Sequence, residues 1–312
     1  MGKLATREAY GDSLKELGDK NQAVVVLDAD LSKSTKTVVF AKAHPDRFIN
    51  VGIAEQNMMG IAAGLAASGK IPFVSTFAMF ATGRAFEQVR NSICYPKLNV
   101  KVAATHAGLT VGEDGASHQS IEDISLMRSL PNMTVIVPAD AEETRQAVEF
   151  AAKHNGPVYL RLGRMAVPDV VGEGYQFAHG KALQLADGKD VTLAATGIMV
   201  SAALEAAKTL AEEGISARVL NIHTIKPIDR DAIAKAAKET GALVSCEEHS
   251  VIGGLGSAVA EVLAETTPAP MERVGVKDTF GESGTPGDLL VKYGLTANDI
   301  VAAAKKAISR KA

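Results

Sequence analysis

The segment VKVAATHAGLTVGEDGASHQ, residues 100–119, decides the fold. It begins with a short apolar run that is typical of a buried strand. It continues into a loop that is rich in Gly and holds two His, one Glu and one Asp. In open α/β proteins, ligands bind at the carboxyl ends of the strands. The segment therefore predicts a strand that carries a polar loop to a binding site.

Similar apolar runs lie on both sides of this segment, and helical patterns separate them. Strands are expected at residues 23–27, 72–75, 100–104 and 134–137. Helices are expected at residues 54–67, 83–94 and 141–154. This alternation of apolar strands and helices predicts a parallel sheet with helices on both faces.

The pattern is interrupted once and then restarts. Residues 164–180 hold one Pro and three Gly without a sustained period, which indicates a linker. Strand and helix patterns then alternate again as far as residue 265. We therefore expect an α/β protein with two parallel or mixed sheets, in which residues 1–170 and 186–312 are domains and residues 171–185 join them.

Composition excludes several classes of protein. Lys and Arg number 33 against 36 Asp and Glu, so no basic excess exists for binding nucleic acid. No run of 18 apolar residues predicts a membrane span, and the first residues resemble no signal peptide. Two cysteines, Cys94 and Cys246, are too few for a disulfide scaffold. We expect a cytoplasmic protein with buried, reduced cysteines.

Glu55 is the first candidate for chemistry. It begins a helix whose next residues are mostly small and apolar. One interpretation is an exposed glutamate that the helix dipole favours. The other is a desolvated carboxylate that shares a proton with a ligand. The residue pattern leaves both open.

The aromatic residues form the second candidate. The chain has no Trp and nine Phe, and four of these Phe lie between Phe73 and Phe86. Phe77 and Phe80 are three residues apart and would share one side of a helical turn. They are either part of an ordinary core or the walls of a flat slot for a heteroaromatic ring.

The polar loop is the third candidate. His106 and His118 lie twelve residues apart without a close pair of ligands, which argues against zinc. Proton transfer and recognition of a hydroxylated substrate fit these residue types better. A second polar group, Glu247-Glu248-His249, follows a later strand, and its role is either ionic or structural.

Several motifs resemble the transketolase family. GIAEQNM at 52–58, STF at 75–77, the stretch from 104 to 140 and LRLGR at 160–164 are similar to its pyrimidine-binding domain. TIKPID at 224–229 and EEHSVIGGLGSAV at 247–259 resemble its C-terminal domain. The resemblance covers nearly the whole chain. The GEDGASHQ block separates it from the β subunits of 2-oxo-acid dehydrogenases.

The resemblance implies thiamine diphosphate as the cofactor. Glu55 matches the catalytic glutamate that hydrogen-bonds the aminopyrimidine ring and promotes formation of the reactive ylid. Phe77 and Phe80 match the pyrimidine pocket, and Asp30 matches an acidic residue beside the cofactor. The third aromatic residue of that pocket falls on Gly83, where Phe86 or Phe73 are the expected replacements.

The resemblance also implies a sugar site. His118 matches the catalytic histidine that contacts the transferred two-carbon unit, and Asp114 matches the carboxylate that recognises an acceptor hydroxyl. The matches to the sugar-phosphate site are Arg7, Ser34, His106 and Arg164. Arg suits this role because its guanidinium binds phosphate through two parallel hydrogen bonds.

One family motif is absent. The sequence contains no Gly-Asp-Gly triplet, with which the family binds the diphosphate and its metal ion. The resemblance thus implies the C-terminal subunit of a split transketolase of the pentose phosphate pathway. An N-terminal subunit would hold the diphosphate and Mg²⁺ (or Ca²⁺), and two such pairs would form a dimer of heterodimers. No metal site is expected on this chain.

The implied activity is transfer of a two-carbon ketol unit from a ketose phosphate to an aldose phosphate. Alternatives with related chemistry are a subunit like 1-deoxyxylulose-phosphate synthase or like a 2-oxo-acid dehydrogenase β chain. A third alternative is a non-catalytic assembly partner.

Overall fold

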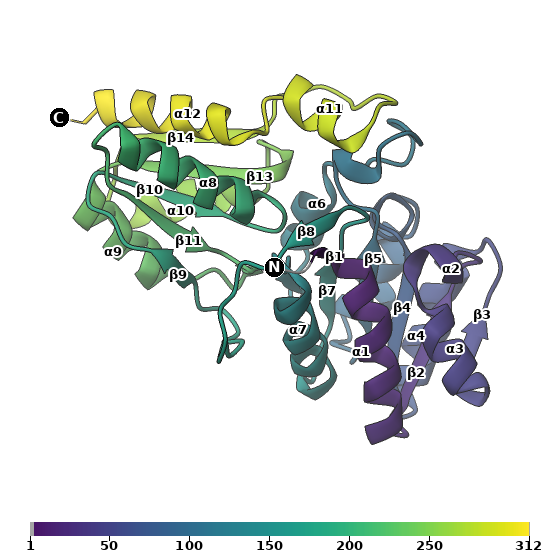
Figure 1. Cartoon of the computed structure of the whole chain (residues 1–312). Coiled ribbons are helices and arrows are strands. Elements are labelled where there is room, and N and C mark those ends of the chain that lie inside the picture. The colour runs from purple at the N-terminus through teal and green to yellow at the C-terminus, as the bar shows by residue number, and fades with distance from the viewer. Residues whose placement is uncertain (1–2, 312) are drawn as a thin grey trace.

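The computed structural model describes residues 3–311, which form two α/β units (Figure 1). The first unit has a seven-stranded sheet in the order β12-β6-β7-β5-β4-β2-β3, and β12 pairs antiparallel while the other pairs are parallel. Its strands are β2 (Val24–Asp28), β3 (Phe48–Asn50), β4 (Ile71–Phe77), β5 (Lys101–Thr105), β6 (Thr134–Ile136), β7 (Val158–Arg161) and β12 (Thr224–Lys226).

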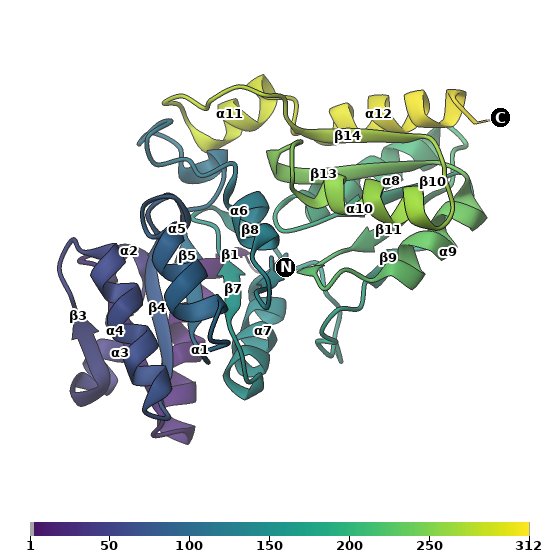
Figure 2. The same cartoon turned by 180° about the vertical axis from the view of Figure 1, so that it is seen from behind.

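Helices cover both faces of this sheet (Figures 1 and 2). On one face, α1, α3 and α7 enclose a core that includes Tyr10, Phe40 and Phe73. On the other face, α4 and α6 pack over a core that includes Met58 and Val102. The helices are α1 (Thr6–Lys20), α2 (Ser32–Thr35), α3 (Val38–Ala43), α4 (Glu55–Ala67), α5 (Phe86–Gln88), α6 (Asp123–Ser129) and α7 (Ala141–Lys153).

The second unit has a five-stranded sheet in the order β14-β13-β10-β11-β9, with β9 antiparallel. Its strands are β9 (Leu183–Ala186), β10 (Val191–Ala195), β11 (Ala217–Asn221), β13 (Leu243–Ser250) and β14 (Met271–Val276). Its helices are α8 (Met199–Glu212), α9 (Arg230–Thr240), α10 (Leu255–Glu265), α11 (Pro286–Lys292) and α12 (Ala297–Ser309). None of the helices in residues 3–311 has the length and apolar character of a membrane span.

The two units are joined by more than the linker. One apolar cluster includes Val102 and Ile124 of the first unit together with Leu255 and Val259 of the second. The strand β12 follows the linker in the chain, yet it pairs with β6 of the first sheet. Burial of a shared apolar cluster holds the two units in a fixed arrangement.

The linker region is held to the first unit. The segment 164–180, whose composition indicates a linker, begins with the strand β8 (Ala166–Pro168), which pairs with β1 (Lys3–Ala5) near the start of the chain. The carboxylate of Asp140, which caps α7, also accepts hydrogen bonds from the backbone amides of Val170 and Val171 at 2.7 and 2.9 Å. These contacts order a segment whose composition alone indicates a loop.

The predicted α/β class with two units is confirmed, but one expected helix differs. Residues 83–94 were expected to form one helix. The chain instead forms two wider π-helical turns, Phe80–Arg84 and Val89–Cys94, on either side of the short α5. Such turns are frequent at functional sites.

Candidate active site

Four of the predicted site residues lie at or just after strand ends at one edge of the first sheet. Phe77 is the last residue of β4, and His106 directly follows β5. Asp30 lies two residues after β2, and Arg164 lies three residues after β7. Because these strands are parallel neighbours, their carboxyl ends lie side by side, at the edge where open α/β sheets bind ligands.

Two phenylalanines and two histidines form an aromatic wall. The rings of Phe77 and Phe80 are stacked with centroids 6.0 Å apart and an interplanar angle of 12°. His106 stacks on Phe77 at 3.9 Å, and His118 meets Phe80 edge-on at 5.4 Å. The structure therefore brings the predicted pyrimidine pocket into contact with two predicted sugar-site residues.

Glu55 lies at the start of α4 and is 2% exposed. Its Oε2 accepts a hydrogen bond from Nη1 of Arg84 at 3.0 Å. The guanidinium of Arg84 also lies over the Phe80 ring, 4.6 Å from its centre. Arg84 thus connects the buried carboxylate with the aromatic wall, a role that the sequence did not reveal.

Phe73 does not replace the aromatic residue that is missing at Gly83. Phe73 is fully buried in the core under α1 and α7, on the opposite face of the sheet from α4. Phe86 packs against the core on the α4 face. The side chain of Met79 fills the space beside Gly83, since a Cβ there would lie 2.6 Å from Met79 Cε.

Arg7, Ser34 and His106 form one polar group. Nη1 of Arg7 donates to the Ser34 carbonyl at 3.0 Å and to Nε2 of His106 at 3.1 Å. A guanidinium only donates, so Nε2 is the acceptor and the His106 proton is on Nδ1, which meets the Thr105 hydroxyl at 2.9 Å. Burial, with Arg7 and Arg164 nearby, lowers the pKa of His106 to about 3. His106 is therefore a neutral ring at physiological pH.

The polar loop brings a further carboxylate to the site. Arg164 donates to the Val111 carbonyl and forms a 3.1 Å ion pair with Glu113, a residue that the sequence did not single out. The adjacent Asp114 is exposed. His118 is half-buried, and its Nδ1 lies 2.9 Å from the Ser117 hydroxyl.

Asp30 lies on the loop after β2, where its carboxylate accepts a hydrogen bond from the Asn50 amide at 3.3 Å. This loop is organised by Asp28, whose buried carboxylate accepts from the hydroxyls of Thr35 and Thr37 and from the Leu31 amide. Burial raises the pKa of Asp28. The sequence did not identify Asp28 as the residue that places Asp30 and Ser34.

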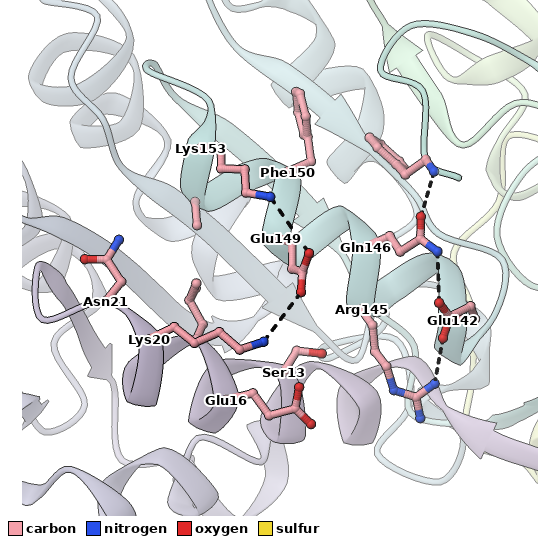
Figure 3. Close-up of a pocket in the computed structure, with 13 residues that line it drawn as sticks. Ser13, Glu16, Lys20, Asn21, Glu142, Arg145, Gln146, Glu149, Phe150 and Lys153 are labelled. Carbon is pink, nitrogen blue, oxygen red and sulfur yellow. Dashed lines mark hydrogen bonds and ion pairs between the residues drawn. The ribbon is translucent and has the colours of Figure 1, made fainter. Parts of the chain in front are cut away.

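A surface groove lies elsewhere, between α1 and α7 (Figure 3). Figure 3 shows that Glu149 in this groove faces both Lys20 and Lys153, with ion pairs of 3.9 and 4.0 Å. The groove shares no lining residue with the predicted site. Across residues 3–311, no three His, Cys, Asp or Glu side chains are grouped so that they could hold a metal ion.

Comparison with known families identifies both units. Residues 2–170 match the transketolase pyrimidine-binding domain, and residues 180–300 match the transketolase C-terminal domain. The chain belongs to the transketolase family.

Several transketolase-family proteins are similar to this chain along nearly their whole length. A Methanocaldococcus jannaschii chain assigned as a transketolase C-terminal section is 51% identical over 94% of this chain and 93% of its own. A 6-deoxy-6-sulfo-D-fructose transketolase subunit from Clostridium sp. is 48% identical over 98% of this chain and 95% of its own length. A solved split-gene transketolase, described as an inactive β4 tetramer, is 63% identical over 99% and 100%, with a TM-score of 0.93.

A transketolase pyrimidine-binding domain indicates the use of thiamine diphosphate. The residues present fit the aminopyrimidine half of this cofactor. The guanidinium of Arg84 is flat, donates N–H to Glu55 and lies over Phe80. An aminopyrimidine is also flat and also carries N–H donors, so the same carboxylate and ring suit it.

Proposed function

We propose that this chain is the C-terminal subunit of a two-chain, thiamine-diphosphate-dependent transketolase. The enzyme transfers a two-carbon ketol unit from a ketose phosphate to an aldose phosphate. The observation that carries the proposal is the buried Glu55, which Arg84 connects to the Phe80 ring, at the edge of the sheet where His106, His118 and Arg164 also lie.

The absence of a diphosphate-binding motif supports the proposal of a second subunit. The sequence carries Glu55, Phe77 and Phe80, which would serve the aminopyrimidine, but no Gly-Asp-Gly triplet for the diphosphate. Relatives that match along nearly their whole length are described as a C-terminal section and as a split-gene product. The partner would bind the diphosphate with Mg²⁺ (or Ca²⁺), and two pairs would form a dimer of heterodimers.

The roles of the cofactor residues follow from their positions. Thiamine diphosphate supplies a nucleophilic carbon that takes up the ketol unit. Glu55 would hold the aminopyrimidine through a carboxylate that burial shields from water. Phe77 and Phe80 would pack against the ring, and Asp30 would lie beside the cofactor at the end of β2.

The residues of the proposed sugar site form two groups. His118, at the edge of Phe80, would contact the transferred unit, and the exposed Asp114 would accept a hydrogen bond from an acceptor hydroxyl. Arg7, His106 and Arg164, with the nearby Ser34, would bind the phosphate. The two guanidinium groups face one carboxylate, Glu113, and a neutral His106, so the site keeps an excess positive charge that suits a phosphate dianion.

The test begins with the partner. Affinity purification of this chain from its source, with mass determination of the co-purifying chain, identifies it. The reconstituted pair is then assayed with xylulose 5-phosphate, with 6-deoxy-6-sulfofructose and with pyruvate as donors. We expect ketol transfer from a ketose phosphate and none from the isolated chain. Decarboxylation of pyruvate as the main activity would support the synthase or dehydrogenase alternative instead.

Two variants test whether this chain takes part in catalysis. Glu55→Gln in the reconstituted pair should abolish most of the activity, because an amide cannot replace the buried carboxylate. Glu16→Gln, on the exposed side of α1, is the matched control and should retain activity. Full activity of the Glu55→Gln pair would show that the chain is a scaffold.

A further inference from the structure

Glu248 links the second unit to the predicted sugar loop. It lies near the end of β13 and is 3% exposed. Its Oε1 accepts a hydrogen bond from the backbone amide of Thr110 at 2.6 Å. Thr110 belongs to the 3-10 turn Leu109–Val111, which lies between His106 and His118 in the loop.

The approach of Glu248 to the loop is unusually close. Gly108 has φ +83°, a conformation that favours glycine. A Cβ at Gly108 would lie 2.3 Å from the carboxyl carbon of Glu248. The loop therefore reaches this carboxylate because residue 108 has no side chain.

The strand that carries Glu248 is itself fixed against the first unit. Arg161 of β7 donates to the Glu248 carbonyl at 2.9 Å, while it binds the buried Asp123 at 2.8 and 3.1 Å. The Ser125 amide donates to Nε2 of His249 at 3.3 Å. Because residues of the first unit hydrogen-bond Glu248 and His249, the Glu248 carboxylate has a defined position beside the loop.

The adjacent Glu247 makes a useful contrast. It is also fully buried, but its carboxylate accepts hydrogen bonds from the amides of Leu255 and Gly256, at the start of α10 in its own unit. Burial raises the pKa of both Glu247 and Glu248 to about 7. The two carboxylates thus share burial and charge, and they differ in whether they contact the sugar loop.

We propose that Glu248 is a positioning residue for sugar binding, through which the C-terminal domain holds the loop that carries His106 and His118. The inference rests on the proposed function, because it assigns the loop to the sugar. A Gly-rich loop has many accessible conformations, and ordering it costs free energy on binding. A carboxylate that holds the Thr110 amide limits those conformations before the sugar arrives.

The experiment compares Glu248→Ala, Glu248→Gln and Glu247→Gln in the reconstituted two-chain enzyme. Glu248→Ala should raise KM for the sugar phosphate about tenfold with a smaller change in kcat, because the loop loses its hydrogen-bond acceptor. The affinity for thiamine diphosphate, which depends on Glu55, should stay within about twofold of the wild type. Glu248→Gln retains an acceptor oxygen and should restore most of the lost affinity.

Glu247→Gln is the matched control. It should lower the melting temperature, because it weakens the start of α10, and leave KM unchanged. Gly108→Ala should raise KM as Glu248→Ala does, since the added Cβ and the positive φ both displace the loop. An unchanged KM in a folded Glu248→Ala enzyme, or an equal rise in Glu247→Gln, would overturn the proposal.

Hydrogen exchange separates this proposal from the proposed function. In the unliganded complex, Glu248→Ala should speed amide exchange at Thr110 about tenfold, whereas Glu247→Gln should not. If exchange responds as expected but no ketose phosphate reacts, the loop contact stands and its assignment to a sugar fails. If the wild type transfers ketol units and exchange at Thr110 is unchanged in Glu248→Ala, the positioning role fails alone.

Discussion

Arg84 donates a hydrogen bond to the buried carboxylate of Glu55 at 3.0 Å, and its guanidinium lies 4.6 Å from the centre of the Phe80 ring. A ligand that hydrogen-bonds Glu55 Oε2 and packs on the same face of Phe80 takes the place of this guanidinium. Arg84 is 49% exposed, so it can move into solvent when an N–H group of the ligand replaces it at Glu55. The ion pair therefore competes with the aminopyrimidine in the proposed enzyme.

Arg84→Ala removes this competition. The guanidinium of this ion pair is half exposed and screened by water, so a contribution of about 1 kcal/mol is expected, and the variant should bind thiamine diphosphate up to about fivefold more tightly. The same variant leaves Glu55 without its charged partner and should lower the melting temperature of the unliganded chain. Calorimetric titration of the reconstituted pair and thermal unfolding measure the two effects. Arg90→Ala, at an exposed arginine that bonds Asn91, is the control. Weaker binding by Arg84→Ala would show instead that Arg84 supports the cofactor.

His106 should show no titration near neutral pH. Burial and the nearby Arg7 lower its pKa to about 3, below the ordinary value of 6.5. The unfolded chain therefore binds a proton that the folded chain does not, so the stability from this residue is present above pH 6.5 and falls as the pH drops from 6.5 towards 3. NMR of the histidine rings, assigned with His106→Gln, should show a constant His106 signal between pH 8 and 5. A midpoint near 6.5 would contradict the buried, Arg-bound ring.

The fold was predictable where strands are buried on both faces. Such strands read as continuous apolar runs, which is why β2, β5 and β10 stand out in the sequence. The three-residue strands β1 and β8 are too short to produce a pattern. The same is true of β12, whose pairing with β6 depends on the packing of the two units.

The site was predictable where its residues are close in the sequence or lie in a family motif. Glu55, Phe77 and Phe80 belong to such motifs. Arg84 was missed because its partner Glu55 is 29 residues away, and the role of Glu248 stayed open because its partner Thr110 is 138 residues away. Contacts of this kind depend on which strand ends meet at the edge of the sheet.

Removing one partner of the buried ion pair between Asp123 and Arg161 should strongly destabilise the fold. Asp123 is fully buried, and it also accepts a hydrogen bond from the Tyr159 hydroxyl at 2.6 Å. Asp123→Asn leaves a buried guanidinium without its counter-charge and should destabilise the chain by about 3–5 kcal/mol. Tyr159→Phe removes one hydrogen bond to a charged group and should cost about 2 kcal/mol. Urea unfolding measures both, and the exposed Asp46→Asn should change little. Equal stability of Asp123→Asn and the wild type would exclude this role.

Arg7 should discriminate between phosphorylated and free sugars. Its guanidinium donates hydrogen bonds to the Ser34 carbonyl and to His106, and it lies near the guanidinium of Arg164. A guanidinium that binds a phosphate contributes a charge-assisted hydrogen bond, so Arg7→Met should raise KM for a ketose phosphate about 10–100-fold. Arg7 also orients His106, and loss of that role would affect every substrate. The unphosphorylated sugar separates the two effects, because its kcat/KM should fall by less than about threefold in Arg7→Met if phosphate binding dominates. Equal losses with both sugars would assign Arg7 to the support of His106 alone.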